Sequence, residues 1–148
     1  MPLIEWRRGA SRLVFLIGGI AIKVPCIKRA SVLTRWGQIL QGRNCNRAER
    51  AAWKERKYPN LCPIVCADFS GWIVVMLRAE APMSDDDFDQ WYHSDDWPHV
   101  YGEETPYELG GNDAGRLPSG RRVMIDYGMR GMQVDLRKYF RTSKSANA

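Results

Sequence analysis

The chain has 148 residues, of which 45% are hydrophobic and 26% are charged, and its net charge is +5. A chain of this length and composition can bury one core and is neither fibrous nor broadly disordered. The longest uncharged apolar run, residues 13–22, is about half of the ~20 residues that a membrane-spanning helix needs, which excludes a transmembrane protein. Residues 1–10 do not lead into a signal peptide, so we expect a cytoplasmic protein.

Three antiparallel strands are predicted in the first 25 residues, because apolar and β-branched residues cluster on either side of glycine-containing turns. Their expected ranges are 3–7, 12–17 and 20–25. Two helices are expected next, at 31–41 and 44–57, with Gly42 ending the first of them. The helical spacing of apolar residues on both sides of Gly42 is the basis of this prediction.

The second half of the chain predicts another hairpin, one helix and a last short hairpin. The expected strands are 61–69 and 72–77, then 115–117 and 121–125, and the helix opens at residues 84–87. Residues 93–111 have no clear period and are expected to form loop with short helical turns, and residues 142–148 are expected to be a disordered tail. Strands and helices in this order predict an α+β protein.

Four cysteines occur in the sequence, at positions 26, 45, 62 and 66. Their spacing lacks the density of a disulfide framework, so we expect free thiols. The pair at 62 and 66 has neither a second pair nor a histidine at the spacing of a zinc site, and no zinc is expected.

The charge is divided into three blocks. Residues 1–60 hold 13 basic and 3 acidic residues, residues 61–113 hold 1 and 12, and residues 114–148 hold 8 and 2. A basic flank of this kind can attract a nucleic acid or another acidic partner. The alternative is that basic and acidic parts of one fold face each other, and both interpretations stay open.

Three side chains stand out for their chemistry. Lys23 lies among strand residues and Glu49 lies on the apolar face of a predicted helix, and each has an ordinary interpretation as a surface residue. Asp126 is less ordinary, because it directly follows an apolar strand and precedes Tyr127-Gly128. A carboxylate at a strand end is often placed to hold a ligand or a metal.

The order of these features resembles the protein-kinase-like fold, including compact aminoglycoside phosphotransferases and small bacterial or phage kinase-like proteins. Gly9 and Ser11 fall at the phosphate-covering turn, and Lys23 matches the lysine of the Ala-x-Lys strand. Glu49 matches the helix glutamate that holds this lysine, and Met76 opens the hinge, residues 76–80. The resemblance covers residues 3–128 and implies ATP and Mg²⁺ as cofactors.

The catalytic loop keeps the family's spacing with altered residue types. Glu108 stands where the family has its catalytic aspartate, and Asp113 stands where it has a metal-binding asparagine. Asp126 matches the metal-binding aspartate of Asp-Phe-Gly, so Asp113 and Asp126 are the expected metal ligands. Glu108 is one methylene longer than aspartate, and a displacement of ~1 Å can slow a reaction about 100-fold.

The resemblance implies a minimal protein-kinase-like architecture. Residues 1–81 correspond to an N-lobe with a five-stranded antiparallel sheet, helices and the hinge, and residues 82–141 correspond to a strongly reduced C-lobe. Only 22 residues follow Asp126, so the activation segment and the substrate-binding helices of the family are essentially absent. A single glycine, Gly9, in the phosphate loop predicts a weak grip on a nucleotide.

Three functions follow as hypotheses. The first is a pseudokinase with impaired or absent phosphotransfer that binds a protein partner, such as a phage-type inhibitor of a host or defence component. The second is an active ATP- and Mg²⁺-dependent phosphotransferase that acts on a small molecule or on itself, with Glu108 orienting the hydroxyl and Lys23 holding phosphate. The third is a nucleic-acid-binding module that uses the basic residues 1–60.

Two further features favour a protein interface. Trp6, Trp91 and Trp97 have no obvious place in a core, and exposed aromatic residues beside charges are typical of such interfaces. Residues 128–141 mix apolar and basic side chains, which predicts either a docking surface or a last element that packs on the domain.

Overall fold

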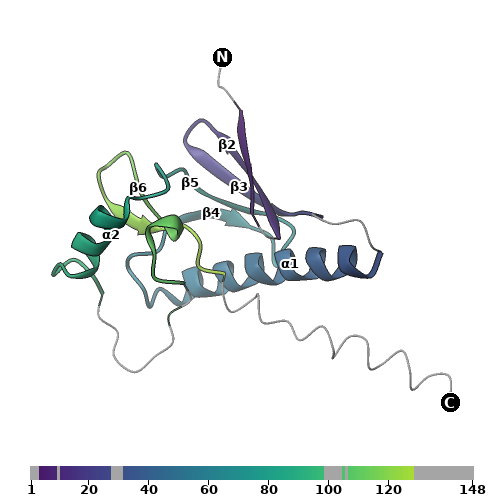
Figure 1. Ribbon diagram of the computed structural model, residues 1–148. Helices are drawn as coiled ribbons and strands as arrows, with labels where there is room; N and C mark the ends of the chain where they lie inside the picture. Colours follow the sequence, from purple (N-terminus) through teal and green to yellow (C-terminus); the bar gives the residue numbers. More distant parts are fainter. Residues whose placement is uncertain (1–3, 10, 28–31, 99–104, 106, 129–148) are drawn as a thin grey trace.

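The computed structural model describes residues 4–9, 11–27, 32–98, 105 and 107–128. The described part of the chain is an α+β protein with a five-stranded antiparallel sheet, a separate two-stranded sheet and two α-helices. Figure 1 shows the longer helix, α1, running along one side of the large sheet, with α2 and the small sheet at one end. The α+β class and the five-stranded antiparallel sheet are therefore confirmed.

The large sheet has the strand order β1-β2-β3-β5-β4, and every neighbouring pair is antiparallel. The first three strands follow directly on one another, because the segments that connect them are as short as the sequence indicates. Gly18 has a positive φ of 55°, which glycine adopts without steric cost. The strands are β1 (Glu5–Arg8), β2 (Arg12–Ile17), β3 (Ile20–Pro25), β4 (Ile64–Ala67) and β5 (Val74–Leu77).

A single helix, α1 (Val32–Glu55), replaces the two helices predicted on either side of Gly42, so that prediction is wrong. Gly42 lies inside the helix at its contact with the sheet. A Cβ atom at this position would lie 2.4 Å from the carbonyl oxygen of Ser11 and 2.9 Å from Pro25. The glycine thus allows close packing, and its helical penalty of ~1 kcal/mol does not end the helix.

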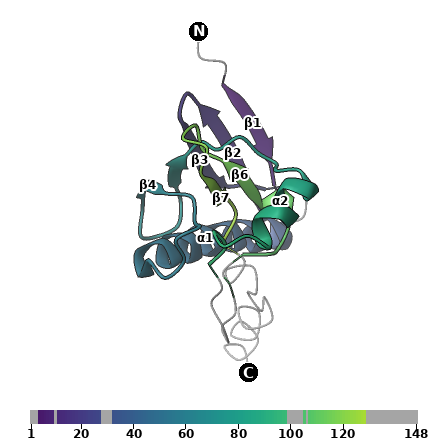
Figure 2. The ribbon, with the colours of Figure 1, turned by 90° about the vertical axis from the view of Figure 1, so that its left-hand side faces the viewer.

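The C-terminal part contains a short helix and a β-hairpin, seen from the side in Figure 2. The helix begins where the sequence predicts, because the Ser84 hydroxyl caps it by accepting a hydrogen bond from the amide of Asp87 at 3.2 Å. The predicted last hairpin is also present. The elements are α2 (Asp85–Tyr92), the 3₁₀ turn η1 (Gly111–Asp113), β6 (Ala114–Arg116) and β7 (Arg122–Met124).

Backbone hydrogen bonds attach this hairpin to the segment that precedes β4. The amide of Cys62 donates to the carbonyl of Met124 at 2.8 Å, and the amide of Met124 donates to the carbonyl of Asn60 at 2.7 Å. Glu80 and Arg116 exchange a second pair of bonds, at 2.8 and 2.9 Å. These contacts place the end of β7, and Asp126 after it, beside the large sheet.

The buried core continues from the large sheet into the C-terminal part as one cluster. Trp91 and Trp97 are 2% and 6% exposed within it, and their rings lie 4.8 Å apart in an edge-to-face arrangement. The expectation that these two tryptophans lack a core position is therefore wrong, whereas Trp6 is 64% exposed. The division into lobes at residue 81 stays a prediction.

The acidic and basic blocks of the sequence do meet in the fold. Asp87 of α2 accepts hydrogen bonds from Arg116 at 2.7 Å and from Arg122 at 2.8 Å. Both arginines stabilise the ionised carboxylate of Asp87 by pairing with it. Part of the segmented charge is therefore compensated within the protein.

The cysteines and the membrane prediction can be compared with the described residues. All four cysteines are free, and only Cys66 is exposed. Among the described residues, no helix is long and apolar enough to cross a lipid bilayer. The tail at 142–148, the mixed segment from 129 to 141 and residues 99–104 lie outside the described residues.

Candidate functional site

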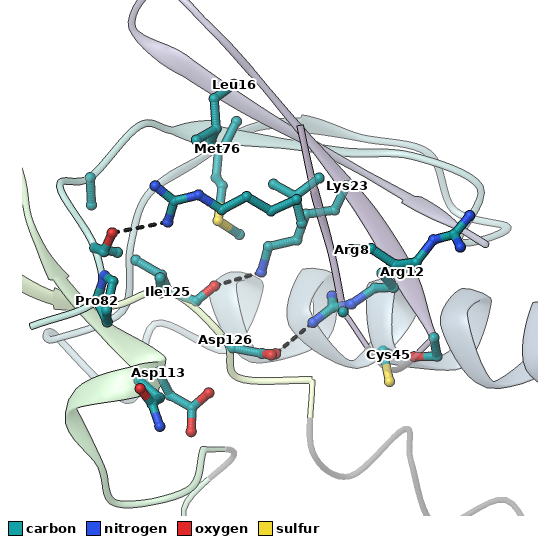
Figure 3. A pocket seen from close by; sticks show the side chains of 18 of the residues that line it. Arg8, Arg12, Leu16, Lys23, Cys45, Met76, Pro82, Asp113, Ile125 and Asp126 are labelled. Atoms are coloured by element: carbon teal, nitrogen blue, oxygen red, sulfur yellow. Dashed lines mark hydrogen bonds and ion pairs between the residues drawn. The ribbon is translucent and has the colours of Figure 1, made fainter. Parts of the chain in front are cut away.

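A cavity of about 360 Å³ lies between the large sheet and the β6–β7 hairpin (Figure 3). Its walls come from five places: the end of β1 with the turn after it, the inward faces of β2 and β3, Cys45 of α1, the end of β5 with the connector after it, and the residues on either side of the hairpin. A volume of this size is within the range of ~300 to 1,000 Å³ that is typical of small-molecule sites.

The cavity has an apolar part and a charged part. Side chains of the strands and of the connector after β5 line the apolar part. The charged part lies where β3 and α1 approach the end of β7. The apolar lining residues are Val14, Leu16, Ala21, Met76, Leu77, Ala79, Ala81, Pro82 and Ile125.

Lys23 and Glu49 form a buried ion pair in the charged part. Lys23 Nζ lies 2.8 Å from Glu49 Oε1 and donates a second hydrogen bond to the carbonyl of Ile125 at 2.5 Å. Lys23 is only 5% exposed and Glu49 is 0% exposed, so the ordinary surface interpretation of each is wrong. Strand alternation explains the burial, because Lys23 shares its face of β3 with the buried Ala21.

Arg12 is a third charged group of the site, which the sequence analysis missed. Its NH1 lies 2.9 Å from Glu49 Oε1 and 3.2 Å from the side-chain oxygen of Asn46, and its NH2 lies 2.5 Å from Asp126 Oδ1. The arginine side chain is 8% exposed. The sequence feature that could have identified Arg12 is strand alternation, because residues two apart in a strand share a face of the sheet. Arg12 lies two residues before Val14, and Val14 is the partner of Lys23 in the β2–β3 register.

Asn46 and Glu49 explain how α1 holds these charges in place. They lie three residues apart on the helix, so they face the sheet together, and both are 0% exposed. The amide group of Asn46 also donates to the carbonyls of Lys23, at 3.3 Å, and Gly71, at 2.9 Å. The helix is thereby tied to β3 and to the β4–β5 turn.

Asp113 and Asp126 are brought together by the backbone. The amide of Ile125 donates to the carbonyl of Asp113 at 2.7 Å, and the amide of Asp126 donates to the same oxygen at 3.4 Å. Both aspartates line the cavity, on its lower side in Figure 3. The two residues are 13 positions apart in the sequence, and the hairpin between them closes this distance.

The two carboxylates have opposite pKa shifts. Burial raises the pKa of Asp113 to about 6, and the negative charges of Asp126 and Glu108 add to this effect. Partial burial opposes ionisation of Asp126 as well, but the charges of Lys23 and Arg12 prevail and hold its pKa at about 2. Asp126 is thus the fully ionised partner of the two buried cations.

The other predicted site residues are placed as follows. Gly9, Ser11 and Met76 line the cavity, and the amide of Gly9 donates to the carbonyl of Arg12 at 2.8 Å. Glu108 is exposed and does not line the cavity, although its charge raises the pKa of Asp113. Their assignments as catalytic, nucleotide-binding or metal-binding residues remain predictions.

The acidic ligands do not form a large cluster. Within the part of the chain that the structure describes, no group of three or more histidine, cysteine, aspartate or glutamate side chains is close enough to hold a metal ion. Glu49 Oε2 is buried without a hydrogen-bond partner among the described residues, while Oε1 accepts from both Lys23 and Arg12.

Comparison with known proteins gives no relative: no family model matches the chain, and no curated protein matches it.

Proposed function

We propose that the chain is a pseudokinase of protein-kinase-like fold, which binds an adenine nucleotide in the cavity and transfers its phosphoryl group slowly or not at all. One observation carries the proposal: Lys23 Nζ meets Glu49 Oε1 at 2.8 Å at the inner end of a cavity that Asp113 and Asp126 also line. A lysine held by a glutamate in this way can bind phosphate oxygens without becoming mobile.

The order of the elements supports this proposal. A strand with the lysine precedes a helix with the glutamate, and the antiparallel pair β4 and β5 follows and leads into a connector. Residues 76–80, the proposed hinge, run along one side of the cavity. This is the arrangement that the kinase resemblance implies, although the C-terminal part is much smaller.

The connector offers a place for the base of the nucleotide. The amides of Arg78 and Glu80 donate to the carbonyls of Gly19 and Arg116, each at 2.8 Å. Between them, neither the amide nor the carbonyl of Ala79 takes part in a hydrogen bond with another described residue. Because Ala79 lines the apolar part of the cavity, its backbone can pair with the polar edge of a flat, otherwise apolar base.

Three features support slow transfer. Glu108, at the position of the catalytic base, is exposed and outside the cavity lining. The amide of Gly9 is used within its own turn, so it is not available to a phosphate. Arg12 holds Asp126 through an ion pair of 2.5 Å, so this carboxylate is not free to position a reacting group.

Thermal unfolding with ATP tests nucleotide binding, both with and without Mg²⁺. At a ligand concentration of about 100 times Kd, binding should stabilise the protein by ~2.7 kcal/mol, which raises Tm by about 5 to 10 °C for a chain of this size. Lys23→Met should abolish the shift, whereas Lys54→Met, at an exposed position of α1, should retain it. No shift of the wild-type chain in either condition would refute the proposal.

A macromolecular partner is the second part of the proposal, and the exposed apolar side chains favour it. Trp6, Trp36 and Phe69 are 64%, 65% and 80% exposed, and aromatic residues are enriched at protein interfaces. Binding of this chain would inhibit such a partner, for example a host or defence component. Trp6→Ser and Phe69→Ser should reduce capture of that partner without changing Tm, and unchanged capture by both would contradict this part.

A further inference from the structure

Arg12 occupies the position beside Asp126 that a metal ion would need. Its guanidinium is held by three acceptors, the side chains of Glu49, Asn46 and Asp126, at 2.9, 3.2 and 2.5 Å. The group is planar and cannot lose its proton in a protein, so it is a permanent cation in a fixed orientation. In Figure 3 the guanidinium points directly at the Asp126 carboxylate.

We propose that the cavity binds the phosphate groups of a nucleotide without a divalent metal ion, and that Arg12 supplies the positive charge in place of the metal. The inference rests on the proposed nucleotide binding and deepens it. The ligand is accordingly a metal-free nucleoside polyphosphate, bound by Arg12 and Lys23 together.

The pairing of Asp126 supports this inference, because Arg12 competes with Mg²⁺ for this carboxylate. The ion requires near-octahedral oxygen ligands and usually binds one or two free carboxylates. Asp126 Oδ1 is already bonded to Arg12, which leaves Asp113 as the other carboxylate of the cavity lining. A metal at Asp126 Oδ1 would have to displace Arg12 and would leave that buried cation with Glu49, which already pairs with Lys23.

The positive charge in the cavity is sufficient for an anion. Arg7, Arg8, Arg12 and Lys23 all line it, and Arg7 and Arg8 are exposed. Asp113 and Asp126 are the acidic residues of the lining, and Glu49, which pairs with Arg12 and Lys23, is not part of it. A phosphate group in the cavity can accept charge-assisted hydrogen bonds from Arg12 and Lys23, and hydrogen bonds of this kind are the stronger class.

Titration calorimetry with ATP, in EDTA and in excess Mg²⁺, tests the inference on the full chain. The wild-type protein should bind ATP in EDTA at least as tightly as in Mg²⁺, and Mg²⁺ alone should leave Tm unchanged. Arg12→Gln should weaken binding in EDTA by at least about tenfold, since it removes a charged hydrogen-bond donor. The matched control is Arg121→Gln, at an exposed arginine of the hairpin far from the cavity lining, and it should bind like the wild type.

The possible results separate the two proposals. Binding that requires Mg²⁺ would overturn the metal-free inference and leave the nucleotide proposal standing. Absence of binding in both conditions would overturn both. If Arg12→Gln fails to fold, the wild-type comparison between EDTA and Mg²⁺ still decides, and Arg12→Lys provides a second variant that keeps the charge but cannot bridge Glu49 and Asp126.

Discussion

Removal of the negative charge of Glu49 should destabilise the protein more than any other single charge change in the cavity. Glu49 is 0% exposed, and its Oε1 lies within 2.9 Å of two buried cations, Arg12 and Lys23. Glu49→Gln preserves the shape and one acceptor but leaves these cations with less compensation. Loss of one partner of a buried pair costs ~3 to 5 kcal/mol, and the retained amide oxygen places the expected loss near the lower limit.

Urea denaturation followed by tryptophan fluorescence measures this loss. The free energy of unfolding of Glu49→Gln should fall by ~3 kcal/mol with an unchanged m-value, because the area exposed on unfolding is the same. Glu55→Gln is the matched control, since Glu55 is an exposed glutamate near the end of the same helix, and it should change stability by less than about 0.5 kcal/mol. A loss below ~1 kcal/mol for Glu49→Gln would refute the reasoning.

The sign of a double-mutant cycle gives a sharper test. In the wild type, Lys23→Met removes a cation that Glu49 and the carbonyl of Ile125 stabilise, so stability should fall. In the Glu49→Gln background the same change removes a buried cation that has lost its partner, so stability should rise. If Lys23→Met lowers stability equally in both backgrounds, the two residues are not coupled and the ion pair does not carry the energy assigned to it.

Two further predictions concern packing and pH. Gly42→Ala should destabilise the protein by ~1 to 3 kcal/mol despite the better helix propensity of alanine, because the new Cβ would lie 2.4 Å from the Ser11 carbonyl oxygen. Chemical denaturation measures this loss, and the control is Gly19→Ala, whose new Cβ would meet no atom within 4 Å. An equal effect of both substitutions would contradict the prediction. Asp126, with its pKa lowered to about 2, stabilises the fold above its unfolded pKa of about 4, and this contribution is lost as the pH falls from about 4 towards 2. Because the carboxylate is 52% exposed, Asp126→Asn should lower the free energy of unfolding by only ~1 to 2 kcal/mol at pH 7. Denaturation curves of mutant and wild type should converge near pH 2. A difference in stability that stays constant between pH 4 and pH 2 would exclude the ion pair as its source.

Local sequence signals were sufficient for most of the secondary structure. Short turns between β-branched runs predicted β1 to β3, and Ser84 before three aspartates predicted the start of α2, because turn chemistry and helix capping depend on neighbouring residues alone. The same local reasoning failed at Gly42. A glycine inside a helix costs ~1 kcal/mol, and this cost is small beside the packing of a long helix against a sheet.

The charged site shows the limit of single-residue interpretation. Lys23 and Glu49, each considered alone, are ordinary surface residues, and only the order of elements in the resemblance suggested that they meet. Arg12 was missed because its role depends on the β2–β3 register and on the Asp126 carboxylate, which is 114 positions away in the chain. Trp91 and Trp97 were misplaced for a similar reason, since both belong to a cluster of aromatic rings that also includes Phe88, Tyr92 and Tyr107.

The sequence by itself thus determined the strands, the turns, the start of the second helix and the residue types that can carry charge, since these depend on interactions within a few positions. The tertiary structure decided which charges are buried and which side chain pairs with which. A charge is stable in the interior only where an opposite charge lies beside it. Here α1 places Glu49, and the β6–β7 hairpin places Asp126, beside the cations Arg12 and Lys23 of two strands of the sheet. The pairing of these charges depends on the packing of segments that are distant in the sequence, which no local pattern encodes.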